Sequence, residues 1–110
     1  MNERHRYQNC IASCSSCAIA CESCAAACLQ ENGDRLPVRC IQLCGACADL
    51  CHLAAVLMVR QSEYSPALCQ LCQAVCNACA EECAVHSSEH CRECAGACQR
   101  CAEECEAMAA

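Results

Sequence analysis

From Cys10 to Cys28 the chain reads CIASCSSCAIACESCAAAC, with a cysteine at every third or fourth position. Residues that alternate steps of three and four lie along one face of an α-helix, the face by which helices pack in a bundle. In a strand the repeat would instead be two residues. This stretch therefore predicts a long helix whose packed face, called the seam below, is made of cysteine.

The same spacing returns three times downstream, so the chain has four cysteine-lined segments. Within the segments, all steps between successive cysteines are of three or four residues. The 20 cysteines are Cys10, Cys14, Cys17, Cys21, Cys24, Cys28, Cys40, Cys44, Cys47, Cys51, Cys69, Cys72, Cys76, Cys79, Cys83, Cys91, Cys94, Cys98, Cys101 and Cys105. We interpret the segments as four copies of one cysteine-lined helix.

The residues between the cysteines also favour helices. Alanine, the best helix former, is abundant. Pro37 and Pro66 suit the first turns of two helices, and Asn32-Gly33-Asp34 predicts a turn. Short connections force neighbouring helices to be antiparallel, so we predict an all-α, up-down-up-down four-helix bundle that forms one domain over residues 1–110. The predicted helices are about 3–31, 37–60, 66–86 and 88–108.

Composition excludes several functions. The chain has 7 basic residues, all Arg, against 13 acidic ones, and its net charge of −6 argues against nucleic-acid binding. It has only two aromatic residues, both Tyr, to stack on bases. Leu, Ile and Val are scarce and Phe is absent, which leaves too few aliphatic side chains for an ordinary core. The cysteines must therefore supply both the core and the chemistry.

The N-terminal sequence guides the choice of compartment. The charged start runs straight into Cys10, Ser13, Cys14 and further polar residues, which is too polar for a secretory signal. The least polar run, 54–59, is far shorter than the roughly 18 apolar residues of a membrane span. We therefore expect a cytoplasmic protein without membrane contact. The cytosol keeps thiols reduced, which favours metal or redox chemistry over a disulfide framework.

Three uses of cysteine other than metal binding explain this pattern poorly. Cysteine can act as a small buried hydrophobe, but a seam of cysteine alone would be thin for native packing density. Cysteines four apart on one helix have nearly parallel Cβ vectors, which makes poor disulfides. A thiol enzyme needs one exposed, activated thiolate, and a ladder of equivalent cysteines singles out none. We expect no catalysis.

Thiolates select soft ions, and the ligand count helps to choose among them. Zinc takes four cysteines, so 20 would form about five sites. Iron–sulfur clusters use few cysteines in short loops. Cu(I) accepts two or three thiolates, and two cysteines four apart could hold one ion in a nearly linear site. With each sulfur shared by two ions, the chain would bind up to about 20 Cu(I).

Charge favours Cu(I) over zinc. Each thiol loses one proton on metal binding, and each Cu(I) restores one positive charge, so 20 Cu(I) leave the net charge near −6. About five Zn(II) on the same thiolates would bury about ten uncompensated negative charges, which is costly. Sequestration of zinc or of soft metals in general remains the alternative.

The four cysteine ladders resemble the bacterial copper storage proteins, a family of copper-binding four-helix bundles. The resemblance covers about residues 5–108, and the cysteine count and the absence of a leader resemble the cytosolic branch. It implies storage of Cu(I) in the interior, either as a reserve or against copper toxicity, and a tetramer of bundles. It also implies a polar end that carries histidine, which His86-x-x-x-His90 matches here.

Steps of seven residues from the cysteines predict different side chains at the two ends of the bundle. His86 lies seven residues beyond Cys79, on the seam, whereas His90 lies one step off it. Met58 and Met108 lie on the seam at the opposite end, near Tyr7. We therefore expect metal to enter at the His86 end, with His86, His90, Met58 and Met108 as possible accessory ligands. His5 and His52 have no seam position and are expected at the surface.

A second apolar stripe precedes the cysteine stripe by one position in the second and third helices. Its members are Leu43, Ala46, Leu50, Leu53 and Leu57, followed by Leu68, Leu71, Val75 and Ala78. Part of the stripe is expected to pack against neighbouring helices within the bundle. The rest would form a self-association face through the second and third helices, consistent with the tetramer that the resemblance implies.

Overall fold

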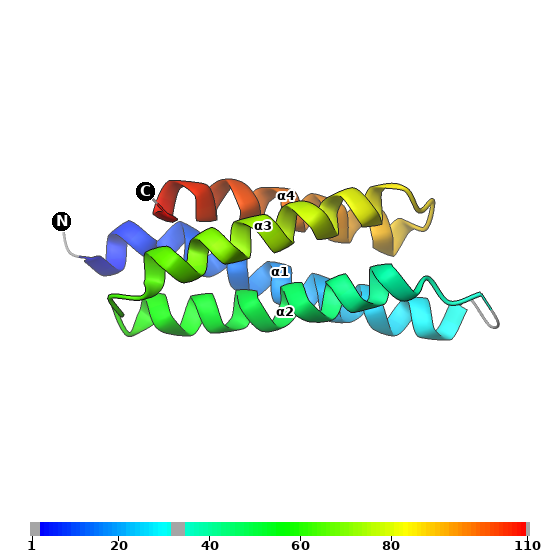
Figure 1. The fold of residues 1–110 in the computed structure, drawn as a ribbon, viewed down its shortest axis with the longest axis horizontal. Coiled ribbons are helices and arrows are strands. Elements are labelled where there is room, and N and C mark those ends of the chain that lie inside the picture. Colours follow the sequence, from blue (N-terminus) through cyan, green and yellow to red (C-terminus); the bar gives the residue numbers. More distant parts are fainter. Residues whose placement is uncertain (1–2, 32–34, 110) are drawn as a thin grey trace.

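The computed structural model describes residues 3–31 and 35–109, with side chains from Tyr7 onward. Within them the chain forms α1 (Glu3–Glu31), α2 (Val38–Val59), α3 (Ser65–Ala84) and α4 (Glu89–Ala109). Successive helices run in opposite directions along a rod of 50 × 18 × 18 Å (Figure 1). The predicted all-α, up-down-up-down four-helix bundle is confirmed. The predicted turn at Asn32-Gly33-Asp34 lies outside the described residues.

The helices begin and end within two residues of the predicted ranges. Pro37 is the N-cap residue of α2, and Pro66 lies in the first turn of α3, where its missing N–H costs no helical hydrogen bond. The α3 helix ends earlier than predicted, at Ala84, with Val85 as its C-cap. This early end changes the position of His86.

The four helices surround one central axis. Each packs against two neighbours: α1 lies against α2 and α4, and α3 lies against the same two helices. All four seams face inward, and every cysteine is at most 2% exposed. Aliphatic side chains such as Ile11, Ile41 and Leu50 flank the cysteines and are partly buried against them. A few aliphatic residues suffice because they fill only the flanks of the core.

Two helical segments are more apolar than the sequence reading allowed. Tyr7–Glu31 and Val38–Val59 have mean hydropathies of 1.4 and 1.7 and are long enough to cross a membrane. The expectation that no stretch has this character was wrong, because cysteine and alanine raise the hydropathy of the first segment, and leucine, valine and isoleucine add to them in the second. In the fold these cysteines face the interior of the bundle. A core helix of a soluble bundle has the same composition, so the hydropathy alone does not indicate a membrane span.

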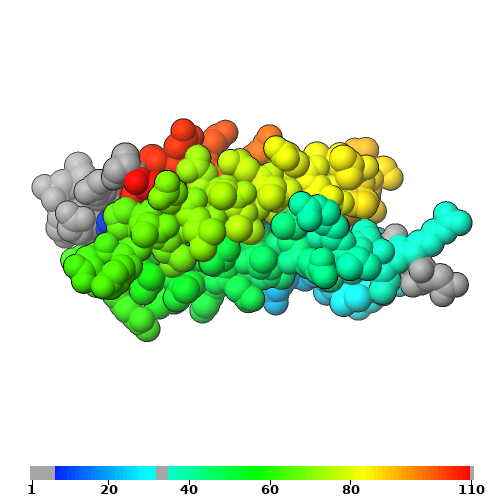
Figure 2. Space-filling model, in the orientation of Figure 1, coloured from blue at the N-terminus to red at the C-terminus, as the bar shows by residue number. Residues whose placement is uncertain are grey.

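The outer faces are mixed polar and apolar. Figure 2 shows the side on which α2 and α3 lie next to each other.

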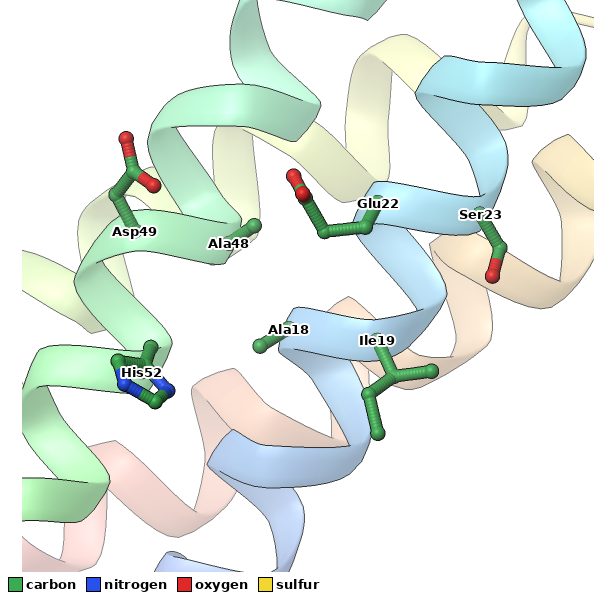
Figure 3. Close-up of a pocket in the computed structure, with 7 residues that line it drawn as sticks. All are labelled: Ala18, Ile19, Glu22, Ser23, Ala48, Asp49 and His52. Atoms are coloured by element: carbon green, nitrogen blue, oxygen red, sulfur yellow. The ribbon is translucent and has the colours of Figure 1, made fainter.

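A surface groove of about 440 Å³ lies between α1 and α2 and is lined by side chains that include Glu22, Asp49 and His52 (Figure 3). His52 is exposed, as predicted, and no cysteine lines this groove. The side chain of His5 lies outside the described residues.

Candidate metal centre

The cysteine sulfurs form a connected column along the axis of the bundle. Neighbouring Sγ atoms are 3.5 to 4.0 Å apart, both within one helix, as for Cys17 and Cys21 at 3.9 Å, and between helices. The Sγ atoms of Cys47 on α2 and Cys76 on α3, for example, are 3.5 Å apart. Because the column draws on all four helices, every helix contributes thiols to the same central region.

These spacings favour particular coordination numbers. With a metal–thiolate bond of about 2.3 Å, as for zinc, two sulfurs on opposite sides of an ion lie about 4.6 Å apart. Three sulfurs around an ion lie about 4.0 Å apart, and four in a tetrahedron about 3.8 Å. The column therefore matches ions with three or four sulfur ligands. Pairs of cysteines four apart whose sulfurs lie 3.8 to 4.0 Å from each other, such as Cys17 and Cys21, do not preform the expected nearly linear site, because their sulfurs would need to separate by about 0.6 Å.

Groups of four sulfurs also occur. Cys17, Cys21, Cys47 and Cys98 place their Sγ atoms within 4.8 Å of one another, and so do Cys21, Cys44, Cys79 and Cys94. All of these cysteines are buried. Geometry alone thus admits both shared-thiolate clusters and isolated four-sulfur sites, and the choice between them depends on charge.

The described part of the core contains no cation to balance thiolates. Its single buried polar or charged side chain is Ser65. Burial raises the pKa of Cys24 and Cys91, and it raises the pKa of Cys28 to about 12 from an ordinary 9.0. These thiols therefore hold their protons at neutral pH without metal. A bound ion must displace the protons and supply the positive charge.

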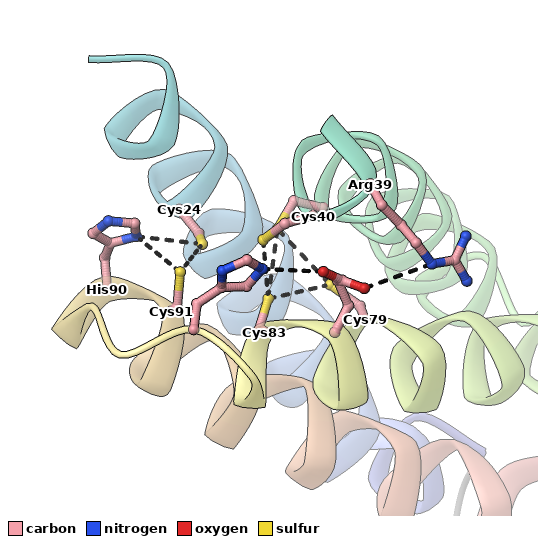
Figure 4. Close-up of polar contacts among 10 residues, drawn as sticks. Cys24, Arg39, Cys40, Cys79, Cys83, His90 and Cys91 are labelled. Atoms are coloured by element: carbon pink, nitrogen blue, oxygen red, sulfur yellow. Dashed lines mark hydrogen bonds and ion pairs between the residues drawn. The ribbon is translucent and has the colours of Figure 1, made fainter. Parts of the chain in front are cut away.

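Among the three histidines whose side chains the structure describes, His90 reaches the sulfurs (Figure 4). Its Nδ1 atom lies 3.5 Å from Cys24 Sγ and 3.6 Å from Cys91 Sγ, while its Nε2 atom lies 2.7 Å from a carboxylate oxygen of Glu31. With Nε2–H donating to Glu31, Nδ1 is left as an acceptor facing two thiols. A carboxylate that orients a histidine in this way is typical of metal sites. The sequence did not reveal this carboxylate partner.

The interpretation that His86 is the histidine on the seam was wrong. The α3 helix ends at Ala84, so the heptad that placed His86 on the seam does not continue to it. Its Nε2 atom instead lies 3.0 Å from Glu82 Oε2, and the other oxygen of Glu82 lies 3.6 Å from Arg39 Nε. His90, predicted one step off the seam, is in the first turn of α4, where side chains lean beyond the helix end. That lean carries it over Cys24 and Cys91.

The opposite end of the bundle is closed by larger side chains. Met58 is fully buried, and its Sδ atom lies 3.9 Å from Cys69 Sγ. Tyr7 is 6% exposed, and Met108 is partly buried against the core. Ser65 lies four residues before Cys69, at a seam position that the sequence reading overlooked, and it is fully buried. The two ends thus differ as predicted, with histidines and carboxylates at one and mainly apolar residues, beside the buried Ser65, at the other.

Comparisons with known sequences agree with this arrangement. The sequence model of the copper storage protein family matches residues 3–110 of the chain. A relative from Bacillus subtilis strain 168, the uncharacterized cysteine-rich protein YhjQ, is 43% identical over 81 residues. The match spans 74% of this chain and 75% of that protein.

Solved structures are similar over nearly the whole chain. The Cu(I)-bound copper storage protein BsCsp3 is 41% identical, with a TM-score of 0.92 over 96% of this chain and 99% of that one. A cytosolic copper storage protein from Streptomyces lividans, solved with five coppers, is 39% identical, with a TM-score of 0.90. That match covers 97% of this chain and 94% of the Streptomyces chain.

Proposed function

We propose, since the chain belongs to the copper storage protein family, that it stores Cu(I) on the thiolates that line its bundle. The observation that carries this proposal is the connected column of buried sulfurs, with no cation buried among the residues that the structure describes. Such a column offers soft ligands only, which suit Cu(I). It is also buried, which keeps a toxic ion away from reactants in solution.

The ligands are the 20 cysteines of the four seams. All are buried, and most of their sulfurs contact sulfurs from other helices, so one thiolate can bridge two ions. Shared in this way, the thiolates hold up to about 20 Cu(I), each with two or three sulfurs. At full occupancy, with as many Cu(I) as thiolates, the net charge of the chain is again near −6. The fully loaded core then carries no uncompensated charge.

Zinc is the second candidate, because the four-sulfur groups have a suitable geometry. Each Zn(II) with four thiolates would bury two negative charges, and no cation is buried in the described part of the core to balance them. We therefore place zinc behind Cu(I). An anaerobic Cu(I) titration against a competing chelator tests the choice, and we expect saturation well above ten ions per chain. Saturation near five, with Zn(II) bound equally tightly, would replace the proposal with the zinc alternative.

Copper enters at the end that carries His90. The imidazole faces Cys24 and Cys91 through Nδ1, so it can bind an ion and pass it to the first thiols. His86 lies nearby but faces Glu82, and we give it no ligand role. At the other end Met58 lies against Cys69, where its thioether can join the terminal ion, and Met108 lies near the same end. The buried apolar residues there make it a poor entrance.

The setting we propose is the cytoplasm, with protection against copper toxicity as the role and no catalysis.

Self-association into a tetramer would use α2 and α3. In the apolar stripe, Leu43, Leu50 and Leu68 are partly buried against the cysteines, whereas Leu53 and Leu71 are 45% and 51% exposed. The exposed members could contact another copy of the chain. A Leu53→Glu variant that sediments with the same mass as the unmodified protein would rule out this face.

A further inference from the structure

Some of the cysteine sulfurs form closed triangles in which each sulfur contacts the other two. In one triangle the Sγ atoms of Cys51, Cys72 and Cys76 are 3.5, 3.6 and 3.8 Å apart. In a second, those of Cys17, Cys21 and Cys98 are 3.6 to 3.9 Å apart. Four triangles share no member with one another: Cys10, Cys14 and Cys105; Cys17, Cys21 and Cys98; Cys44, Cys79 and Cys83; Cys51, Cys72 and Cys76.

The size of these triangles sets the geometry of an ion bound to all three sulfurs. The centre of the Cys51–Cys72–Cys76 triangle lies roughly 2.1 Å from each sulfur, slightly less than a bond of about 2.3 Å. An ion bonded equally to the three sulfurs therefore sits up to about 1 Å above their plane. The resulting shape is a shallow pyramid with the ion at its apex. Elements that keep a lone pair opposite three ligands adopt this shape.

The negative charge of three thiolates indicates which oxidation state an ion needs if it binds one triangle alone. Three thiols lose three protons, so a trivalent ion leaves the triangle neutral. A single Cu(I) in the same triangle leaves two negative charges unless its sulfurs are shared with other copper ions. No charged side chain is buried in the described part of the chain to balance such an excess. An isolated triangle in this core is therefore best matched by a soft trivalent ion.

We propose that the four triangles bind trivalent arsenic, supplied as arsenous acid, as a second cargo of the bundle. The uncharged acid, As(OH)₃, exchanges its three hydroxyl groups for three thiolates. Three As–O and three S–H bonds break, three As–S bonds form, and three water molecules leave. Arsenic stays trivalent throughout, so the step needs no oxidant or reductant. Arsenic binding uses the same thiols as the proposed copper storage but does not depend on that function.

The test is an anaerobic titration of the fully reduced protein with sodium arsenite, followed by native mass spectrometry and thiol counting. We expect at least four bound arsenic atoms per chain, each adding the mass of one arsenic less three hydrogens. We also expect each arsenic to remove three thiols from reaction with a thiol reagent under denaturing conditions. Loss of two thiols per arsenic, or saturation below four, would overturn the proposal.

Two matched triple variants test whether the triangles themselves are the sites. Replacement of Cys10, Cys14 and Cys105 by Ser removes one triangle, whereas replacement of Cys40, Cys69 and Cys101 by Ser removes three equally buried thiols and leaves all four triangles intact. We expect the first variant to bind one arsenic fewer than the unmodified protein and the second to bind as many. Equal losses in the two variants would overturn the proposal. Circular dichroism verifies that both are helical.

A Cu(I) titration of the same protein separates the two cargoes. Copper binding without arsenic binding would overturn this inference and leave the proposed function intact. Arsenic binding at the expected ratio with weak copper binding would overturn the proposed function and support the triangles. If a triple variant does not fold, the thiol count per arsenic on the unmodified protein still decides the outcome.

Discussion

A serine at position 51 would test whether the core depends on sulfur rather than on size. Cys51 is fully buried, and its Sγ atom contacts the sulfurs of Cys47, Cys72, Cys76 and Cys101 at 3.5 to 3.9 Å. A hydroxyl in its place is smaller and would have only thiols around it, which are weak hydrogen-bonding partners. Serine also does not bind Cu(I) as a thiolate does.

The structure sets the size of both effects. A buried hydroxyl without a good partner costs about 1–3 kcal/mol, so we expect the metal-free Cys51→Ser protein to lose that much free energy of unfolding. Since the thiolates and Cu(I) are matched one to one, the loaded protein should hold about one ion fewer. Copper stabilises the folded protein by binding it in preference to the unfolded chain, so the loaded variant should also unfold more easily.

Urea unfolding of the metal-free protein measures the first effect, and native mass spectrometry of the loaded protein measures the second. Cys51→Ala is the control, because it removes the sulfur without adding a hydroxyl and should lose less stability in the metal-free state but as much copper. A Cys51→Ser protein with unchanged stability and an unchanged copper count would refute the account of the sulfur column.

Four further predictions concern the two ends and the protons of the core. His90→Ala should slow Cu(I) uptake several-fold in stopped-flow measurements and lower capacity by at most one ion, whereas His86→Ala should change neither. Met58→Ala should cost about 2–5 kcal/mol in urea unfolding, because it leaves a cavity in a fully buried site, while Met58→Leu should cost less than about 1.5 kcal/mol. Because burial raises the Cys28 pKa to about 12, its contribution to metal-free stability is present below pH 9 and should be lost as pH rises through about 12, which thermal unfolding across that range can follow. Copper affinity should respond in the opposite direction and fall as pH falls, since each ion displaces a proton.

The cysteine ladders were enough to predict the helices, their order and the closed core. Alternation of three and four residues is a strong signal because it keeps every cysteine on one face of a helix. A shift of the pattern by one residue would rotate the whole stripe away from the axis of the bundle. The larger side chains that close the end opposite His90 were also foreseeable, since Met58 and Tyr7 continue the same periodicity beyond the cysteines. These features depend on spacing along one helix, which the sequence contains directly.

The histidine end could not be predicted in the same way. The spacing favoured His86, but the position of that side chain depends on where α3 stops, and the helix stops two residues earlier. The contact of His90 with Cys24, and with Glu31 behind it, joins α4 to the last turns of α1. Contacts between helices depend on their relative height and rotation, which heptad arithmetic within one helix does not supply. The triangles of sulfurs escaped prediction for the same reason.

The central claim is that Cu(I) fills the core without a change in net charge, and the number of protons released per copper tests it most directly. Addition of Cu(I) to the fully reduced protein in weakly buffered anaerobic solution, with the pH held constant by titrated base, measures this ratio. Averaged over complete filling, the account predicts about one proton per Cu(I), with release ending near 20 protons per chain. An average of two or more protons per copper at saturation, or an end point near five ions, would contradict it.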